Sequence, residues 1–470
     1  MRRTLAALFA ALLLAACASF PPNPPLAEYV PKAGYSFDQL APGRNNTDKL
    51  FVIVTFSGGG TRAAALAYGV LEELRATQIN GATADATLLE EVDVISSVSG
   101  GSFTAAYYAL HGKKLFDEFP QRFLYRKVQS ELLGQMLSPV NWLRLAGSSF
   151  GRSDLAAEFY DHELFDGATY ADLIARKQRP FVVLNATDMT TGTPFPFIQD
   201  QFDMMCSDLA GVPIARAAAS SSAFPGALTP LTFQNYAGSC KYRQPSWVAR
   251  TDEDQAQRIN ARRRAIAVNR LSLAAEGPAR PYIHLTDGGV ADNIGLRGPL
   301  DALSSTDHPW SVVRMMNNRL VDRLVVITVN AATGAEAKRD QSAGVPGLID
   351  TVITAADVPL GNYSFDTVEL MRKAADESDR DRRLLEQCNQ LSAARGAQCA
   401  LNLPSAHKVD FYPIQVSFEY IASPKERAWF RGLPTTFELP PKTVDKLRTV
   451  GRQLLREDPQ FQLLLKQLRG

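Results

Sequence analysis

The chain has 470 residues, with 50 Lys and Arg against 49 Asp and Glu, which leaves a formal net charge of +1. Hydrophobic residues make up 46% and charged residues 21%, a globular composition that excludes the disordered and fibrous classes. A chain this long can bury one large core, and its balanced charge provides no field to attract nucleic acid, so we expect no nucleic-acid partner.

The first segment of the chain has the features of an export signal. Arg2 and Arg3 precede an apolar run that ends at Ala16 and is too short for a resident membrane span. The run ends in Leu-Ala-Ala-Cys, and Cys17 resembles the lipidated cysteine of bacterial lipoproteins. We therefore expect residues 1–16 to be a signal peptide and acyl chains on Cys17 to anchor the protein. The alternative is an ordinary secretory signal with a chance cysteine.

The residues after the cysteine indicate where the protein resides. Ala18 follows Cys17, where an aspartate often retains lipoproteins at the inner membrane, so the outer membrane is favoured. Residues 17–49 are rich in proline and read as the lipidated cysteine and a semi-extended tether. Membrane lipids are thus expected as the anchor's partners, and protein partners cannot be inferred.

From residue 50 onward apolar strand patterns alternate with helical ones. Such alternation predicts an α/β fold in three α/β/α layers, with a largely parallel central sheet and helical insertions. Ligands bind such sheets at the carboxyl ends of their strands. The predicted strands are 51–56, 92–98, 181–185, 282–286 and 324–329, and the first two are followed by helices at 63–75 and 103–110.

Two insertions interrupt the alternation. Residues 126–165 contain an apolar helical stretch, and residues 249–280 carry seven arginines among apolar residues. Either is a candidate lid or membrane-facing flap, and the alternative is ordinary packed helices with a solvated face. Further along, residues 372–383 predict an exposed helix, and residues 441–469 predict terminal helices interrupted at Pro459.

The first strand ends in a triglycine loop. Gly58, Gly59 and Gly60 precede Thr61 and Arg62 directly before a helix. Consecutive glycines let backbone amides point into a cavity at a positive helix terminus, where they can bind a phosphate or stabilise an oxyanion. The loop lacks the spacing of nucleotide-binding fingerprints, and the alternative is a flexible glycine turn.

The second predicted strand ends at Ser99. Gly100 and Gly101 follow, and a helical pattern then begins. A serine on a sharp strand-to-helix turn has the geometry of a nucleophile elbow, with its hydroxyl beside the positive helix end. The alternative is a buried strand that ends in a Ser/Gly turn.

A third loop follows the strand at 282–286. Asp287, Gly288 and Gly289 lie at its carboxyl end. An Asp-Gly turn alone is common and most often structural.

Together the three loops resemble the patatin-like phospholipase family over residues 50–300, with residues 301–470 read as a continuation of the same domain. The resemblance implies a catalytic dyad of Ser99 and Asp287 and an oxyanion hole at Gly58, Gly59 and Gly60. Supporting positions are Arg62, Gly101, Gly288 and Gly289, and residues 217–225 look like the family's small-residue helix. Arg62 either steadies the loop or meets a lipid phosphate. One departure is Ser97 at the first glycine position of the GxSxG motif.

The implied activity is a serine hydrolase that releases fatty acid from phospholipid or lysophospholipid without a cofactor. Alternatives are a weakly active or inactive protein of the same fold that binds lipid or assists envelope assembly, and a broad esterase or thioesterase. A histidine-containing triad is the rival mechanism, but only His308 and His407 follow Asp287. His284 should point to the opposite face of its strand from Asp287.

After Cys17 the chain contains four cysteines. An even number in an exported protein predicts two disulfides. Proximity favours the pairs Cys206–Cys240 and Cys388–Cys399, although four cysteines allow three pairings. No CxxC or HxxxH spacing accompanies them, so no metal site is expected.

Overall fold

A computed structural model describes residues 19–469, except 48, 81–82, 84, 252–260, 276–278, 306, 335–342, 344, 346 and 395–408. The expected signal peptide and Cys17 therefore lie outside the described residues. Within the described part of the chain, no helix is both long and apolar enough to cross a bilayer.

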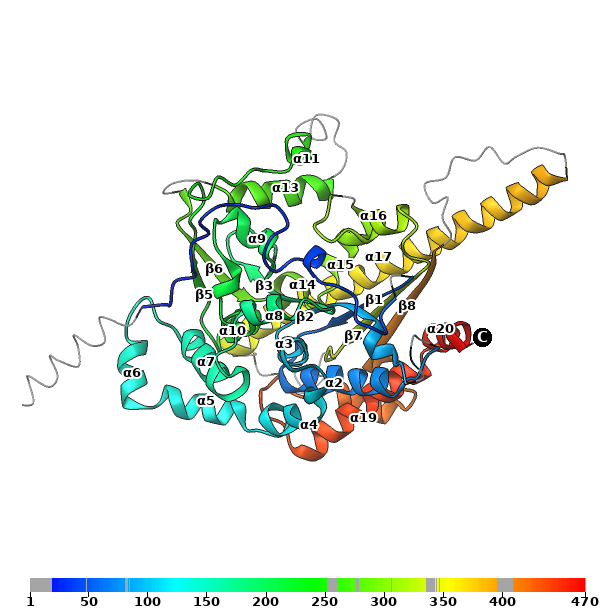
Figure 1. The fold of residues 1–470 in the computed structure, drawn as a ribbon. Coiled ribbons are helices and arrows are strands. Elements are labelled where there is room, and N and C mark those ends of the chain that lie inside the picture. The colour runs from blue at the N-terminus through cyan, green and yellow to red at the C-terminus, as the bar shows by residue number, and fades with distance from the viewer. Residues whose placement is uncertain are drawn as a thin grey trace, which may run out of the picture.

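One mixed sheet organises the molecule, with strand order β5-β6-β3-β2-β1-β7-β8 and β4 paired to β3 (Figure 1). The path from β3 to β8 is parallel, whereas β4, β5 and β6 pair antiparallel. The strands are β1 (Leu50–Phe56), β2 (Val92–Val98), β3 (Phe181–Asp188), β4 (Pro194–Pro196), β5 (Leu231–Gln234), β6 (Tyr282–Asp287), β7 (Arg323–Asn330) and β8 (Asp410–Ser417). The prediction of a largely parallel α/β sheet is confirmed.

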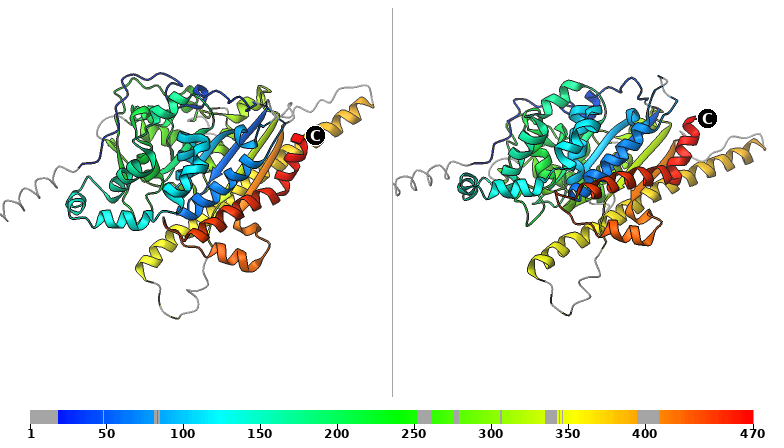
Figure 2. Two further views of the ribbon diagram at one scale, coloured as in Figure 1. Left: turned by 60° about the horizontal axis from the view of Figure 1, so that its bottom comes forward. Right: turned by 90° about the horizontal axis from the view of Figure 1, so that it is seen from below.

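Helices cover both faces of this sheet. Figures 1 and 2 show α2, α3 and α19 on one side and α15, α16 and α17 on the other. The longer helices are α2 (Gly60–Ala76), α3 (Gly100–His111), α5 (Val128–Met136), α6 (Pro139–Leu145), α7 (Arg152–Tyr160), α8 (Tyr170–Arg176), α10 (Ile214–Ser221), α13 (Ala261–Leu273), α15 (Arg297–Ser304), α17 (Leu348–Ala393), α18 (Pro424–Arg431), α19 (Pro441–Glu457) and α20 (Pro459–Arg469). The shorter ones are α4 (Leu115–Phe119), α9 (Gln199–Met204), α11 (Ser246–Ala249), α14 (Gly289–Asp292) and α16 (Val312–Asn317).

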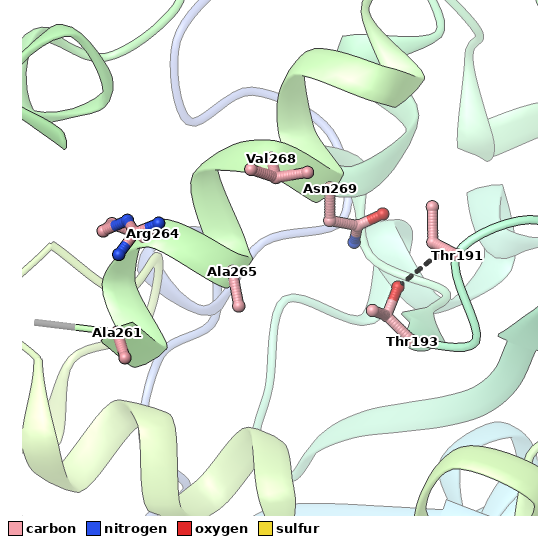
Figure 3. A pocket seen from close by; sticks show the side chains of 7 residues that line it. All are labelled: Thr191, Thr193, Ala261, Arg264, Ala265, Val268 and Asn269. Carbon is pink, nitrogen blue, oxygen red and sulfur yellow. Dashed lines mark hydrogen bonds between the residues drawn. The ribbon is translucent and has the colours of Figure 1, made fainter. Parts of the chain in front are cut away.

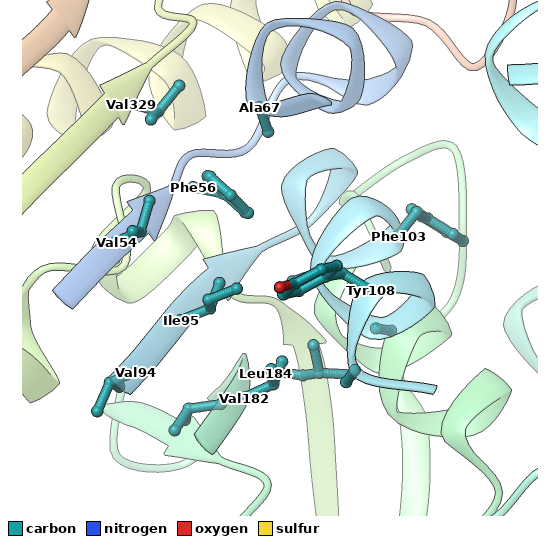
Figure 4. Packing of buried hydrophobic residues seen from close by; sticks show 14 of the residues in the cluster. Val54, Phe56, Ala67, Val94, Ile95, Phe103, Tyr108, Val182, Leu184 and Val329 are labelled. Carbon is teal, nitrogen blue, oxygen red and sulfur yellow. The ribbon is translucent and has the colours of Figure 1, made fainter. Parts of the chain in front are cut away.

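The core lies where the central strands meet these helices. Every residue of β1, β2 and β3 is buried, as expected for parallel strands covered on both faces. Figure 4 shows Phe56 and Ile95 of neighbouring strands on the side of α3 from which Tyr108 points toward the sheet, with Phe103 on the far side of that helix. This packing holds the ends of β1 and β2 in one rigid frame, from which both of their following loops project.

The C-terminal part of the chain completes the same sheet and covers it. Helix α19 packs along α2, where Arg456 pairs with the buried carboxylate of Glu73 at 2.7 Å. Hydrogen bonds from Arg456 and Arg452 lower the pKa of Glu73. Strand β8 was not predicted because Pro413 interrupts its pattern; the structure places it at the sheet edge, where a missing N–H is tolerated.

The other sequence predictions have mixed outcomes. Cys206 and Cys240 form the expected disulfide, whereas Cys399, the expected partner of Cys388, lies outside the described residues. The terminal helices break at Pro459 as predicted, and residues 372–383 form part of α17. Of the two insertions, residues 126–165 form α5, α6 and α7, and residues 249–280 are described only in part, chiefly as α13.

Candidate active site

Ser99 occupies a strained turn between β2 and α3. Its backbone has φ 49° and ψ −121°, a conformation that side-chain-bearing residues seldom adopt and that costs about 1–3 kcal/mol. The Ser99 N–H donates to Oγ of Ser221 in α10 at 2.9 Å, which fixes the turn from the neighbouring helix. The predicted elbow geometry is therefore present, with Ser99 directly before the first turn of α3.

A buried group of serines supports this elbow and explains the departure at Ser97. The Ser97 hydroxyl donates to the Val183 carbonyl at 3.3 Å and accepts from Ser102 at 3.2 Å. Ser102 is in turn 2.9 Å from Ser221, whose hydroxyl also donates to the Asn185 carbonyl. The extra hydroxymethyl group of Ser97 is thus hydrogen-bonded rather than intrusive. Sequence reasoning included Ser221 only as part of the small-residue helix at 217–225 and gave it no role, since only the fold brings α10 beside the elbow.

Asp287 lies against the Ser99 side chain. The Ser99 hydroxyl donates to Oδ2 of Asp287 at 2.8 Å, and the N–H of Gly289 donates to Oδ1 at 2.7 Å. Both side chains are almost closed off from solvent, with Ser99 7% and Asp287 4% exposed. Charge-assisted hydrogen bonds of this kind orient the carboxylate, so one oxygen faces the serine while the other is held by backbone.

In a largely parallel sheet, Asp287 would lie at the same edge as the ends of its neighbouring strands, but β6 runs in the opposite direction. Strand β6 runs antiparallel to β3, with Asp287 opposite Ala186. Parallel pairing of β2 and β3 places Val98 opposite Asn185, one residue before Ala186. Asp287 therefore reaches Ser99 because β6 runs back along β3 and ends at the level of the elbow.

The triglycine loop borders Ser99 from β1, but its three amides are not equivalent. The N–H of Gly58 donates to the Asn293 carbonyl at 2.9 Å, so the expectation that Gly58 belongs to the oxyanion hole is wrong. Among the residues that the structure describes, none accepts a hydrogen bond from the N–H of Gly59 or Gly60. These two residues have φ 133° and 60°, which turn the loop away from the strand direction.

Arg62 braces this loop instead of facing an open site. Its guanidinium donates to the carbonyls of Ala331 and Leu433 at 2.8 and 2.7 Å and to Thr435 Oγ1 at 3.1 Å. The side chain is buried. Of the two roles left open by the sequence, these contacts support steadying the loop, because the donors are directed at protein acceptors.

Close backbone approaches explain several glycines near the dyad. A Cβ at Gly101 would meet Phe56 at 2.6 Å, and one at Gly288 would overlap the Asn185 carbonyl. A Cβ at Gly58 or Gly289 would meet the side chain of Asn293 within 2.9 Å. Asn293 thus contacts both the glycine loop and the aspartate turn, and sequence reasoning missed it because no motif marked it.

None of the histidines that the structure describes is hydrogen-bonded to Ser99 or Asp287. His284 is exposed, and its Nδ1 lies 3.1 Å from Thr232 Oγ1, as expected for a side chain on the opposite face. His407 lies outside the described residues, and His308 stacks edge-on against Trp310. No group of three or more potential metal ligands occurs among the residues that the structure describes.

Two hollows lie elsewhere on the molecule. The larger, about 440 Å³, lies between α13 and the turn after β3 and is lined by Thr191, Thr193, Ala261, Arg264, Ala265, Val268 and Asn269 (Figure 3). The other, about 260 Å³, is lined by residues that include Phe37, Asp38 and Arg179. Neither is lined by Ser99 or Asp287, so these two residues lie apart from both hollows.

The fold and this site define an α/β protein with a serine–aspartate pair at a nucleophile elbow. The patatin-like phospholipase model matches residues 54–300, just over half of the chain. The chain belongs to the patatin-like phospholipase family. No significant match was found among curated proteins.

Solved structures with detectable similarity include human GIVD cytosolic phospholipase A2, with a TM-score of 0.32 and 15% identity over 63% of this chain and 45% of that one. The same enzyme with methyl gamma-linolenyl fluorophosphonate and terbium chloride gives 0.36 and 14%, over 90% and 59%. VipD from Legionella pneumophila gives 0.29 and 11%, over 94% and 71%. The chain therefore matches about half the length of the human enzyme.

Proposed function

We propose that this protein is a serine acyl-ester hydrolase that releases fatty acid from phospholipid or lysophospholipid. The observation that carries the proposal is the 2.8 Å hydrogen bond from the Ser99 hydroxyl to Asp287. A serine hydroxyl is a weak nucleophile unless an adjacent base accepts its proton, and this carboxylate is in position to do so. Membership of the patatin-like phospholipase family supports a lipid ester as the substrate.

In the proposed reaction, Ser99 Oγ attacks the ester carbonyl while its proton passes to Asp287. The tetrahedral intermediate collapses, and the alcohol leaves with the proton held by Asp287. The acyl group is then bonded to Ser99. Water gives a proton to the same carboxylate and attacks the acyl-enzyme, which releases the fatty acid and returns the proton to Ser99.

The oxyanion of each tetrahedral intermediate needs donors that are in place before the reaction. In this proposal the N–H groups of Gly59 and Gly60 are these donors, because no described residue accepts a hydrogen bond from either of them. Loss of one such donor typically costs about 100- to 1000-fold in turnover. Arg62 contributes by holding the loop against residues 433–435.

Covalent labelling tests the nucleophile directly. A fluorophosphonate carrying an alkyl chain should phosphonylate Ser99, and peptide mass mapping should place the adduct on that residue. Asp287→Asn should label at least about tenfold more slowly, because its amide is a much weaker base. An adduct on another serine, or none on an enzyme that turns over, would contradict the assignment.

We also propose that Cys17 carries the lipid anchor of an exported, outer-membrane lipoprotein. The Leu-Ala-Ala-Cys sequence supports it, and two or more acyl chains are enough for durable membrane attachment. Intact-mass analysis of the membrane-extracted protein should show a diacylglyceryl and acyl adduct, absent from Cys17→Ser. A mature protein with an unmodified Cys17 would overturn this part of the proposal.

A further inference from the structure

Helices α5 and α6 and the turn between them, residues 128–145, are called here the α5–α6 hairpin, although the two helices lie at a steep angle to each other (Figure 1), and several of their apolar side chains are largely exposed. Leu133, Leu137, Val140 and Trp142 are 52%, 81%, 69% and 68% exposed. Leu133 lies in α5, Leu137 in the short turn after it, and Val140 and Trp142 in α6, so these exposed apolar residues gather within ten residues of the chain. A cluster of this kind on a folded protein marks a place where something apolar binds.

The charge pattern of the hairpin favours a lipid bilayer as its occupant. Residues 132–143 contain no Asp, Glu, Lys or Arg. The charges lie on either side of this segment, where Arg126 pairs with Glu131 and Glu163 at 2.6 Å each, and Arg144 pairs with Glu158 at 2.6 Å. An uncharged apolar segment flanked by charged residues suits insertion to headgroup depth, and tryptophan prefers that boundary because its ring has an apolar body and an N–H.

The start of the described chain lies beside this hairpin. Ser19 forms a parallel bridge with Ser149, which follows α6 by a few residues. Figure 1 shows α5 and α6 at the end of the molecule where the described chain begins. Cys17 precedes Ser19 by two residues, which span at most about 7 Å of extended chain. A lipid on Cys17 would therefore hold this end of the protein at a membrane.

We propose that the α5–α6 hairpin inserts into the bilayer surface and fixes how the protein sits on its substrate. This inference rests on the proposed function for two things, the ester-linked lipid that the bilayer provides as substrate and the lipid on Cys17 that holds this end of the protein nearby. The docking itself needs only the uncharged apolar segment and the neighbouring N-terminal segment.

Contacts run from the hairpin to the glycine loop. Oε1 of Gln129, in α5, accepts hydrogen bonds from the Thr436 hydroxyl at 2.6 Å and the Phe437 N–H at 3.2 Å. The Thr436 carbonyl accepts the N–H of Thr61 at 2.8 Å, directly after the triglycine loop. Residues 433–437 thus join the docking element to the loop that borders Ser99.

Tryptophan quenching by brominated phospholipids tests the docking on the full, lipidated chain. In phosphatidylethanolamine and phosphatidylglycerol vesicles with bromines along the acyl chains, fluorescence should be quenched. Trp142→Phe should abolish most of that quenching, whereas Trp429→Phe, at a residue 40% exposed elsewhere, should leave it unchanged. Quenching that survives Trp142→Phe would overturn the proposal.

Hydrolysis separates docking from catalysis. The double variant Leu137→Ser/Trp142→Ser should lose about tenfold or more of vesicle hydrolysis, because it removes two large buried apolar groups from the docked state. Its turnover of a soluble short-chain ester should not change. The matched control Phe365→Ser/Leu391→Ser, at two residues of α17 each 67% exposed, should keep both activities. Equal vesicle hydrolysis by both double variants would contradict docking, whereas a wild type inactive on every ester would contradict the proposed function and leave the quenching result standing.

Discussion

Ser99→Ala is expected to reduce fatty-acid release by at least about 1,000-fold, because no other group can take the acyl chain in the proposed reaction. Asp287→Asn should have a comparable effect through a different cause. The amide keeps the shape of the side chain but cannot accept the serine proton. Both variants should still fold, because Asp287→Asn keeps the shape of its side chain and Ser99→Ala removes only one oxygen atom.

The measurement is release of fatty acid from phospholipid, lysophospholipid and short-chain ester panels, together with thermal unfolding of each variant. Ser148→Ala and Asp366→Asn change the same residue types at exposed positions and should retain full turnover. Activity that persists in Ser99→Ala would disprove the mechanism. Turnover of short-chain esters alone would point to a broad esterase, and a wild type that binds lipid but hydrolyses nothing would point to a binding or envelope-assembly role.

Gly100→Ala is expected to have the second largest effect. A Cβ at this position would lie 2.6 Å from the backbone nitrogen of Gly60 and 2.7 Å from its carbonyl carbon. The loop and the elbow must then separate, and a displacement of about 1 Å at reacting groups can cost about 100-fold in rate. Overpacking of this kind also costs about 1–3 kcal/mol of stability.

Single-turnover acylation and chemical denaturation measure these two effects separately. Gly361→Ala, in α17, is the matched control, because the added carbon would meet nothing within 4 Å beyond its own stretch of helix. It should leave acylation unchanged and should not destabilise the protein, since alanine favours a helix over glycine by about 0.5–1 kcal/mol. Wild-type acylation by Gly100→Ala would mean that the glycine loop does not have to approach the elbow this closely, and that Gly60 is not an oxyanion donor.

Local patterns predicted much of the fold. Residues 92–98 were predicted as a strand and form β2 with the same limits, because an uninterrupted apolar run bounded by a Ser-Gly turn is a strong signal. Strand β8 was missed because its proline carried the opposite signal, which is harmless only at a sheet edge. Whether a strand lies at an edge depends on long-range pairing and cannot be read from its own residues.

The candidate site, like the fold, was predicted from sequence only in part. The candidates Ser99, Asp287 and the glycine loop could be named from sequence because each follows a strand directly. The sequence could not show that Gly58 is no oxyanion donor, because its N–H donates to the carbonyl of Asn293, far along the chain. Nor could the sequence decide between the two roles that it offered for Arg62, because the acceptors of its guanidinium belong to residues 331, 433 and 435.

The sequence by itself determined the type of fold, the family resemblance and a serine on a strand-to-helix turn, because these depend on residues close together in the chain. Only the tertiary structure decided that Asp287 contacts that serine, since this requires β6 to run antiparallel along β3. It also decided which apolar residues of α5, α6 and the turn between them are exposed to solvent near Ser19. Burial and strand pairing are set by segments distant in sequence, and no local pattern encodes them.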